Sequence, residues 1–235
     1  MIDIHSHILF GVDDGADSLS EALKLILAAQ KEGVEKLFAT PHYYGERPTH
    51  RELLQERAAC IREALREQGS SFPIYLGNEV LWFESMPKHL KEGRILPLGN
   101  SRFVLTEFFP GEKVPGILYA IRRIREAGYR AVIAHCERIQ DFYKAGLEEV
   151  IGQGALLQIS TAVFEAPPWS RELAFCKRAV KNNWIHFLGT DAHNMAVRPP
   201  KARAAIQWIQ KHAPDPEALL KGNAQRYLLD ACEKL

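Results

Sequence analysis

Histidine and carboxylate residues recur at the carboxyl ends of short apolar segments in this chain. Six segments show the pattern, at residues 2–5, 37–42, 74–79, 103–107, 132–135 and 186–191. Parallel strands of α/β proteins carry the active site at their carboxyl ends. Because imidazole and carboxylate groups are ligands of catalytic divalent cations, the pattern predicts a multi-metal hydrolytic centre at one edge of a sheet.

Two pairs of candidate ligands have a spacing that places both side chains on one face of a strand. His5 and His7 form the first pair, and Asp191 and His193 form the second. Residues i and i+2 of a strand point to the same side, so each pair can reach one ion. A His-x-His pair also occurs by chance, and the first pair alone leaves both explanations open.

The acidic pair Asp13 and Asp14 follows the first strand and gives the His5 and His7 pair more weight. Both aspartates could instead be turn residues before a helix cap at Ser18. We favour Asp14 as a metal ligand and assign Asp13 to the turn or to the support of a ligand.

Four more candidates stand singly at strand ends: His42, Glu79, Glu107 and His135. Each has a structural alternative, because a carboxylate after a strand often caps a helix and a lone histidine is often structural. Their joint occurrence favours metal binding. Nine ligands are too many for one ion, and three ions sharing bridging carboxylates are the natural count. The remaining histidines are excluded: His50, His89 and His212 as surface residues, and His186 because it begins its strand.

Clustered divalent ions lower the pKa of bound water and neutralise the oxygens of a phosphoryl group. Such a site also needs cations that hold the phosphate. Arg138, three residues after His135, and Arg198, five residues after His193, are placed for this role. A guanidinium binds phosphate oxygens bidentately. From spacing alone, either arginine could equally be a surface or helix-start residue.

Strand and helix patterns alternate along the whole chain. Strands are predicted at 2–5, 35–40, 73–77, 103–107, 130–135, 155–160 and 184–189. Helices are predicted at 18–33, 49–68, 84–93, 115–128, 139–152 and 169–182, with two or three more in 200–234. This alternation predicts a parallel sheet with external helices. Since ligand residues come from nearly every strand, a seven-stranded barrel fits better than an open sheet, and residues 1–235 are expected to form a single domain.

Composition restricts the partners and the compartment. The 235 residues carry a formal net charge of +1, which argues against nucleic acid as a partner. Cys60, Cys136, Cys176 and Cys232 form no CxxC pair and fit a reducing cytoplasm. The chain has no signal-like start and no apolar run near the roughly 18 residues that span a bilayer. We therefore expect a cytoplasmic protein without membrane insertion.

Several motifs together resemble one superfamily. They are His5-Ser6-His7, Asp13-Asp14-Gly15, Thr40-Pro41-His42, Gly77-Asn78-Glu79, Glu107, Ala134-His135-Cys136-Glu137-Arg138 and Asp191-Ala192-His193-Asn194, followed by Arg198-Pro199-Pro200. In this order, and over nearly the whole chain, they resemble the PHP (polymerase and histidinol phosphatase) superfamily. The most similar branch is that of the bacterial manganese-dependent protein-tyrosine phosphatases of capsule and exopolysaccharide loci.

The resemblance implies a distorted (β/α)7 TIM-like barrel with a trinuclear site. It implies that His5, His7 and Asp191 hold one ion with Glu79 as the bridge, that Glu107 and His135 hold a second, and that Asp14, His42 and His193 hold a third. It further implies three divalent ions, manganese first, with iron, cobalt or zinc as alternatives. Arg138 and Arg198 would bind the phosphate. The implied reaction is hydrolysis of phosphotyrosine on a bacterial tyrosine autokinase by metal-bound hydroxide, without a phospho-enzyme.

Two loops depart from the branch, and other functions stay open. The segments 43–48 and 108–113 differ from the pattern, and both follow strands that carry ligands, so the chemistry transfers better than the substrate. A small-molecule phosphatase of the histidinol-phosphate type, a metal-dependent nuclease or a catalytically decayed metal scaffold would use the same barrel. Cys60 and Arg66 also match the Cx5R spacing of thiol phosphatases. That stretch is helix-patterned and glycine-free, which is unsuited to cradling a phosphate.

Overall fold

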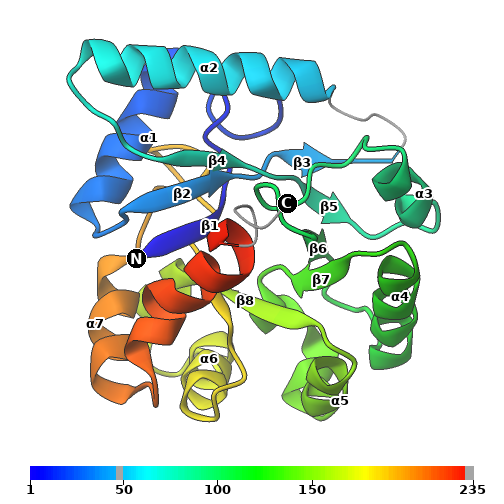
Figure 1. The fold of residues 1–235 in the computed structure, drawn as a ribbon. Coiled ribbons are helices and arrows are strands. Elements are labelled where there is room, and N and C mark those ends of the chain that lie inside the picture. Colours follow the sequence, from blue (N-terminus) through cyan, green and yellow to red (C-terminus); the bar gives the residue numbers. More distant parts are fainter. Residues whose placement is uncertain (46–49, 231–235) are drawn as a thin grey trace.

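The computed structural model describes residues 1–45 and 50–230. The strands are β1 (Ile2–Ser6), β2 (Lys36–Ala39), β3 (His42–Tyr43), β4 (Ile74–Leu76), β5 (Glu79–Leu81), β6 (Phe103–Glu107), β7 (Arg130–Ile133), β8 (Leu156–Ser160) and β9 (Phe187–Gly189). The α-helices are α1 (Leu19–Lys31), α2 (Arg51–Glu67), α3 (Met86–Lys91), α4 (Val114–Glu126), α5 (Leu147–Gly152), α6 (Arg171–Lys181) and α7 (Arg203–His212). Figure 1 shows the helices arranged outside a ring of strands.

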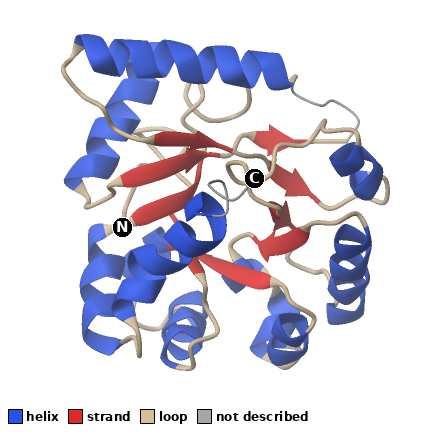
Figure 2. Ribbon diagram, in the orientation of Figure 1, coloured by secondary structure: helices blue, strands red, loops and turns tan. Residues whose placement is uncertain are grey.

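All strand pairs in the two sheets are parallel. One sheet has the order β1-β2-β4 and the other β3-β5-β6-β7-β8-β9. Two residues separate β2 from β3, and two separate β4 from β5, so each pair counts as one strand position. Figure 2 shows the strands in red with blue helices around them. The result is seven strand positions in a curled parallel sheet. The predicted distorted (β/α)7 arrangement is confirmed.

The first and last strands meet through the backbone of candidate ligands. The Asp191 amide donates to the carbonyl of His5 at 2.8 Å, and the His7 amide donates to the carbonyl of Ala192 at 2.8 Å. An isolated parallel bridge joins Ser6 to Ala192. These bonds lie at the carboxyl ends of β1 and β9, so the ring of strands comes together at the edge that carries the site.

Local signals explain the first helix well. Ser18 caps α1, and its side chain accepts a hydrogen bond from the Glu21 amide at 3.2 Å. The helix buries Ala22, Leu25 and Ile26 against the sheet. Gly33, with φ of 96°, ends this segment in a backbone conformation that favours glycine.

The predicted helix over 139–152 is wrong in its first half. The chain instead forms two 3-10 turns, Cys136–Arg138 and Gln140–Tyr143, before the short helix α5. Gly146, with φ of 90°, separates the turns from α5. The predicted helix 49–68 is shorter in the structure, and residue 49 lies outside the described residues. The segment after residue 200 forms α7 and then two π-helical stretches, Ala218–Gly222 and Gln225–Leu229.

The apolar core has two parts. The larger cluster lies between the strands and the surrounding helices. The smaller contains residues from β1, β2, β6, β7, β8 and β9, for example Ile4, Phe38, Val132 and Phe187, together with Leu228. Because these residues come from strands around the whole ring, they fill its interior. Within the described residues, no helix has both the length and the apolar character needed to cross a bilayer.

Candidate metal centre

The structure gathers the nine predicted ligands at the carboxyl ends of the strands. His5 lies on β1, His42 on β3, Glu79 on β5 and Glu107 at the end of β6. The other five, His7, Asp14, His135, Asp191 and His193, lie in segments that follow β1, β7 or β9. Eight of the nine fall into three groups whose ligand atoms lie within 4.8 Å of one another, and His135 contacts a member of the third group.

The first group consists of His5, His7, Glu79 and Asp191, all of them buried. The Nε2 atoms of His5 and His7 face each other at 3.2 Å. Asp191 Oδ1 lies 3.4 Å from His5 Nε2 and 3.5 Å from His7 Nε2. Two imidazole nitrogens and two carboxylates therefore converge on one point, as the ligands of a shared cation would.

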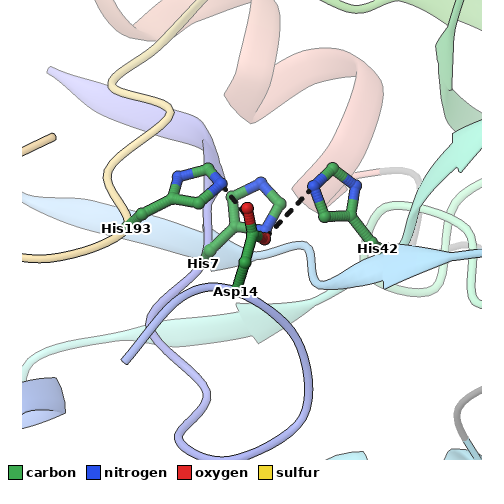
Figure 3. Close-up of side chains that lie close together, drawn as sticks. All are labelled: His7, Asp14, His42 and His193. Atoms are coloured by element: carbon green, nitrogen blue, oxygen red, sulfur yellow. Dashed lines mark ion pairs between the residues drawn. The ribbon is translucent and has the colours of Figure 1, made fainter. Parts of the chain in front are cut away.

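The second group consists of His7, Asp14, His42 and His193 (Figure 3). Asp14 Oδ1 lies 3.4 Å from His42 Nε2 and 3.5 Å from His193 Nε2. The His7 and His193 rings stack with centroids 3.9 Å apart. The Asp14 side chain is 65% exposed, so this group lies on the solvent side of the cluster.

The third group consists of His42, Glu79 and Glu107. His135 adjoins it, with Nε2 2.8 Å from Glu79 Oε1 and 3.6 Å from Glu107 Oε1. Glu79 is common to the first and third groups, as a carboxylate that bridges two ions would be.

The chemistry of the Glu79 carboxylate provides a test of whether this donor set fits divalent cations. Three ring nitrogens, from His5, His7 and His42, lie 3.1 to 3.2 Å from Glu79 Oε2. That oxygen nevertheless has no hydrogen-bond partner among the described residues, and neither does His42 Nδ1. A buried carboxylate oxygen without a partner is costly. The ring nitrogens and the carboxylate oxygen therefore lie close together without forming hydrogen bonds, as metal ligands around shared ions would.

The electrostatics favour the ionised form of two candidate carboxylates, Glu79 and Asp191. Burial alone would raise the pKa of Glu79, but His5, His135 and His7 outweigh it and hold that pKa well below its usual range. Burial also disfavours the ionised form of Asp191, but His5 and His7 outweigh it, so the pKa of Asp191 lies well below its usual range. Burial and the nearby cations His7 and Arg198 lower the pKa of His193 to about 4. Glu79, Asp191 and His193 are thus held in their metal-binding forms. Burial would lower the pKa of His5 and His7, but neighbouring carboxylates outweigh it and raise both pKa values, so both rings would have to lose a proton to bind a metal. Burial, followed by the charge of Glu79, raises the pKa of Glu107.

Two candidate ligands have strained backbones. His135 has φ of 30° and Asp191 has φ of 53°, a region that non-glycine residues rarely adopt. Such conformations persist where the surroundings enforce them, and they cluster at functional sites. The strain supports a functional role for both residues.

The two predicted phosphate-binding arginines meet at one atom. Arg138 Nη2 donates to Asp191 Oδ2 at 2.6 Å, and Arg198 Nη2 donates to the same oxygen. Asp191 therefore directs Oδ1 to the first group and Oδ2 to the arginines. The arginine side chains are 41% and 37% exposed, so their guanidinium groups are accessible from solvent.

Comparisons with known proteins agree with this geometry. The sequence model of a family described as "Capsular polysaccharide synthesis, CpsB/CapC" matches residues 1–229. The chain belongs to the CpsB/CapC family. Tyrosine-protein phosphatase CpsB of Streptococcus agalactiae serotype III (strain NEM316) is 31% identical over 217 residues, which are 89% of each chain. Tyrosine-protein phosphatase YwqE of Bacillus subtilis (strain 168) is 29% identical over 218 residues, covering 90% of this chain and 84% of YwqE.

Solved structures extend the comparison. One from a study of YwqE from Bacillus subtilis and CpsB from Streptococcus pneumoniae, described as "unique metal-dependent tyrosine phosphatases", has a TM-score of 0.89 at 27% identity, covering 98% of this chain and 95% of that one. A histidinol phosphate phosphatase from Lactococcus lactis subsp. lactis has a TM-score of 0.55 at 14% identity, covering 82% and 86%, a likeness of fold alone. The resemblance seen in the sequence is confirmed at the level of the CpsB/CapC family.

Two buried polar residues outside the predicted ligand set hold the histidines in place. Gln158 Oε1 accepts from the His135 amide at 2.7 Å and lies 3.2 Å from His5 Nδ1. Asp13 Oδ2 lies 2.8 Å from His7 Nδ1 and accepts from the His42 amide at 3.0 Å. An acceptor at Nδ1 fixes the tautomer that leaves Nε2 free for a metal. Asp13, assigned by the sequence to the turn or to the support of a ligand, has both roles. The sequence signal for Gln158 is a glutamine inside the apolar predicted strand 155–160.

Tyr44 packs on His42, a member of the second and third groups, and is partly exposed to solvent. Its ring stacks on His42 with centroids 5.3 Å apart and an interplanar angle of 25°. Burial, followed by the charges of Glu107, Asp14 and Glu79, raises the pKa of Tyr44. The phenol therefore lies within electrostatic range of these carboxylates.

The four excluded histidines lie away from the groups, but the prediction that His89 is a surface residue is wrong. His89 is 8% exposed and is not a surface residue. Its Nδ1 lies 2.8 Å from the Tyr43 hydroxyl and its Nε2 lies 3.1 Å from Arg94, because α3 packs against the β3 and β5 edge. His50 and His212 are exposed, and His186 precedes β9, as expected.

The thiol-phosphatase alternative does not fit the structure. Cys60 and Arg66 both lie on helix α2, and Arg66 pairs with Glu63 at 2.5 Å. A helix directs its amide groups along its axis, so the residues between them cannot cradle a phosphate.

Proposed function

We propose that the protein is a metal-dependent protein-tyrosine phosphatase. The single observation that carries the proposal is the convergence of His5, His7 and His42 on a Glu79 oxygen that has no hydrogen-bond partner among the described residues. Family membership and the printed activities of CpsB and YwqE support the same reaction. We propose that residues 1–235 act as one such phosphatase domain.

The proposed centre holds three divalent ions, with manganese as the first choice and iron, cobalt or zinc as alternatives. The ligands are His5, His7, Asp14, His42, Glu79, Glu107, His135, Asp191 and His193, with Glu79 shared between ions. When bound, such ions lower the pKa of water and offset the charge on phosphoryl oxygens.

The residues of the chain position the substrate phosphate. Arg138 and Arg198 converge on the outer oxygen of Asp191 and remain partly exposed. We propose that they donate to phosphate oxygens, since guanidinium groups match phosphate in charge and geometry. Their common anchor keeps both guanidinium groups beside the first metal group.

We propose a phosphotyrosine-containing protein as substrate, with a bacterial tyrosine autokinase of capsule or exopolysaccharide synthesis as the candidate. The capsular polysaccharide description of the family supports this context. Cys60, Cys136 and Cys176 are free thiols, which fits a cytoplasmic location.

The decisive experiment combines elemental analysis with a substrate panel. Purified protein should contain divalent metal, lose activity on chelation and regain it with manganese. It should hydrolyse phosphotyrosine peptides in preference to histidinol phosphate and oligonucleotides. Preference for histidinol phosphate would replace the proposal with a small-molecule phosphatase, and metal-loaded protein that cleaves no phosphomonoester would refute catalysis.

A further inference from the structure

Exposed apolar side chains gather on the loops that follow the strand ends. Of seven large hydrophobic residues that are exposed in the described part of the chain, five lie on these loops: Tyr44, Phe109, Trp169, Met195 and Val197. Tyr44 and Phe109 belong to the segments 43–48 and 108–113 that depart from the family pattern, although residues 46–48 lie outside the described residues. The edge that carries the metal groups is therefore also the edge with the most exposed apolar surface.

Tyr44 differs from the other four in contacting a candidate ligand. Its ring stacks on His42, and no other exposed aromatic side chain of the described residues has a ring contact with a candidate ligand. Its exposed fraction is 46%, so one ring face is covered while much of the ring is open to solvent. Behind it, Trp82 and Phe83 line the same concave surface, whose volume is about 690 Å³.

Tyr44 and the arginines flank the metal groups from two sides. Asp191, the anchor of the arginines, adjoins His5 at 3.4 Å, and His5 adjoins Glu79 at 3.1 Å. Glu79 adjoins His42 at 3.2 Å, and the ring of Tyr44 lies on His42. A leaving group that extends from the bound phosphoryl group toward His42 would therefore meet the ring of Tyr44.

We propose that Tyr44 is a specificity-determining residue whose ring packs against the leaving aryl group and so selects aryl over alkyl phosphate esters. The proposal rests on the proposed phosphatase function. An aryl ester places a ring directly on the ester oxygen, where it can pack at the 4.5 to 7 Å centroid spacing that aromatic pairs prefer. A serine ester has only a methylene group and backbone there.

The test compares two peptides that differ only in phosphotyrosine or phosphoserine. The ratio of kcat/KM for the two peptides is measured for manganese-loaded wild-type protein and for Tyr44→Phe, Tyr44→Leu and Tyr44→Ala. Dividing each variant's ratio by the wild-type ratio removes the intrinsic difference between the leaving groups. Trp169→Ala is the matched control, because Trp169 is an exposed aromatic residue on the same edge without a ring contact to a candidate ligand in the described residues.

Tyr44→Phe and Trp169→Ala should keep the wild-type ratio. Tyr44→Leu and Tyr44→Ala should lower it on the order of tenfold, as expected from the loss of one aromatic pair and its buried area. A binding measurement checks the same point without turnover. Calorimetry should show that Tyr44→Ala weakens phenylphosphonate binding while leaving methylphosphonate binding unchanged.

The outcomes separate this inference from the proposed function. Wild-type protein that does not prefer the phosphotyrosine peptide contradicts the proposed function. Wild-type preference that persists undiminished in Tyr44→Ala overturns the role of Tyr44 alone. If Tyr44→Ala loses metal by elemental analysis, Tyr44→Leu, which still covers His42, decides: a metal-loaded Tyr44→Leu variant with the wild-type ratio also overturns it.

Discussion

Replacement of Arg138 tests the division of labour between the arginines and the metal groups. Arg138 donates to Asp191 Oδ2, and Arg198 donates to the same oxygen. In Arg138→Ala, Asp191 keeps Arg198 on Oδ2 and the histidines on Oδ1. We therefore expect the variant to retain its full metal content while it loses one donor to the phosphate.

The structure sets the expected size of the effect. Loss of one donor aimed at developing negative charge typically lowers kcat about 10² to 10³-fold. The Arg138 side chain is 41% exposed, so solvent screens it and replaces part of its role. We expect the lower end, about a hundredfold, which corresponds to about 2.7 kcal/mol. Arg138→Lys keeps the positive charge but loses the planar guanidinium group, so its activity should lie between that of the wild type and that of Arg138→Ala.

The assay measures kcat and KM for a phosphotyrosine peptide together with metal content by elemental analysis. Arg66→Ala is the matched control, because Arg66 is an exposed arginine on α2 and is also the arginine of the Cx5R pattern. It should behave as wild type. If Arg138→Ala empties the metal site, or if its kcat stays within about twofold of wild type, the phosphate-binding role is wrong.

Three further predictions address the support of the site, the stability of the fold and the mechanism. Gln158→Leu should weaken metal binding about 10- to 100-fold in a calorimetric titration, because His5 and the backbone of His135 lose their acceptor; unchanged affinity would contradict this. His186 should destabilise the protein in acid: burial lowers its pKa to about 4, so its contribution is present above pH 6.5 and is lost as pH falls toward 4. The loss is about 2 to 3 kcal/mol in urea unfolding of the apoprotein, and His186→Asn should flatten that pH dependence. Cys60→Ser should keep full activity, whereas loss of turnover would revive a thiol mechanism.

The clustering of the candidate ligands could be predicted from sequence because the carboxyl ends of parallel strands lie at one edge of the sheet. The sequence shows a short apolar run followed by His42 or Glu79. A parallel sheet then brings the carboxyl ends of these runs together at one edge. The interruptions of two strands were not visible. Pro41 has no amide hydrogen to donate, and Asn78 bonds to the Pro41 carbonyl and the Leu96 amide. These contacts depend on segments distant in the chain.

The supporting residue Gln158, the burial of His89 and the turns after residue 139 could not be predicted from local sequence alone. Gln158 acts on His5, 153 residues away, so its spacing carries no signal beyond a polar residue in an apolar strand. His89 has charged neighbours in sequence but is buried by Tyr43, 46 residues away. The apolar spacing over 139–152 suits 3-10 turns as well as a helix, and the positive φ of Gly146 decides between them.

Closure of the ring of strands and the clustering of the candidate ligands depend on the same residues. The backbone bonds that join β1 to β9 come from His5, His7, Asp191 and Ala192, and three of these four residues are proposed ligands. The positive φ of Asp191 lies at this junction, and its side chain joins the first metal group to the arginines. A cation bound by His5, His7 and Asp191 would therefore tie the first strand to the last. Because a ligand that binds only the native state stabilises it, metal binding should strengthen the closure of the barrel itself, beyond completing its chemistry.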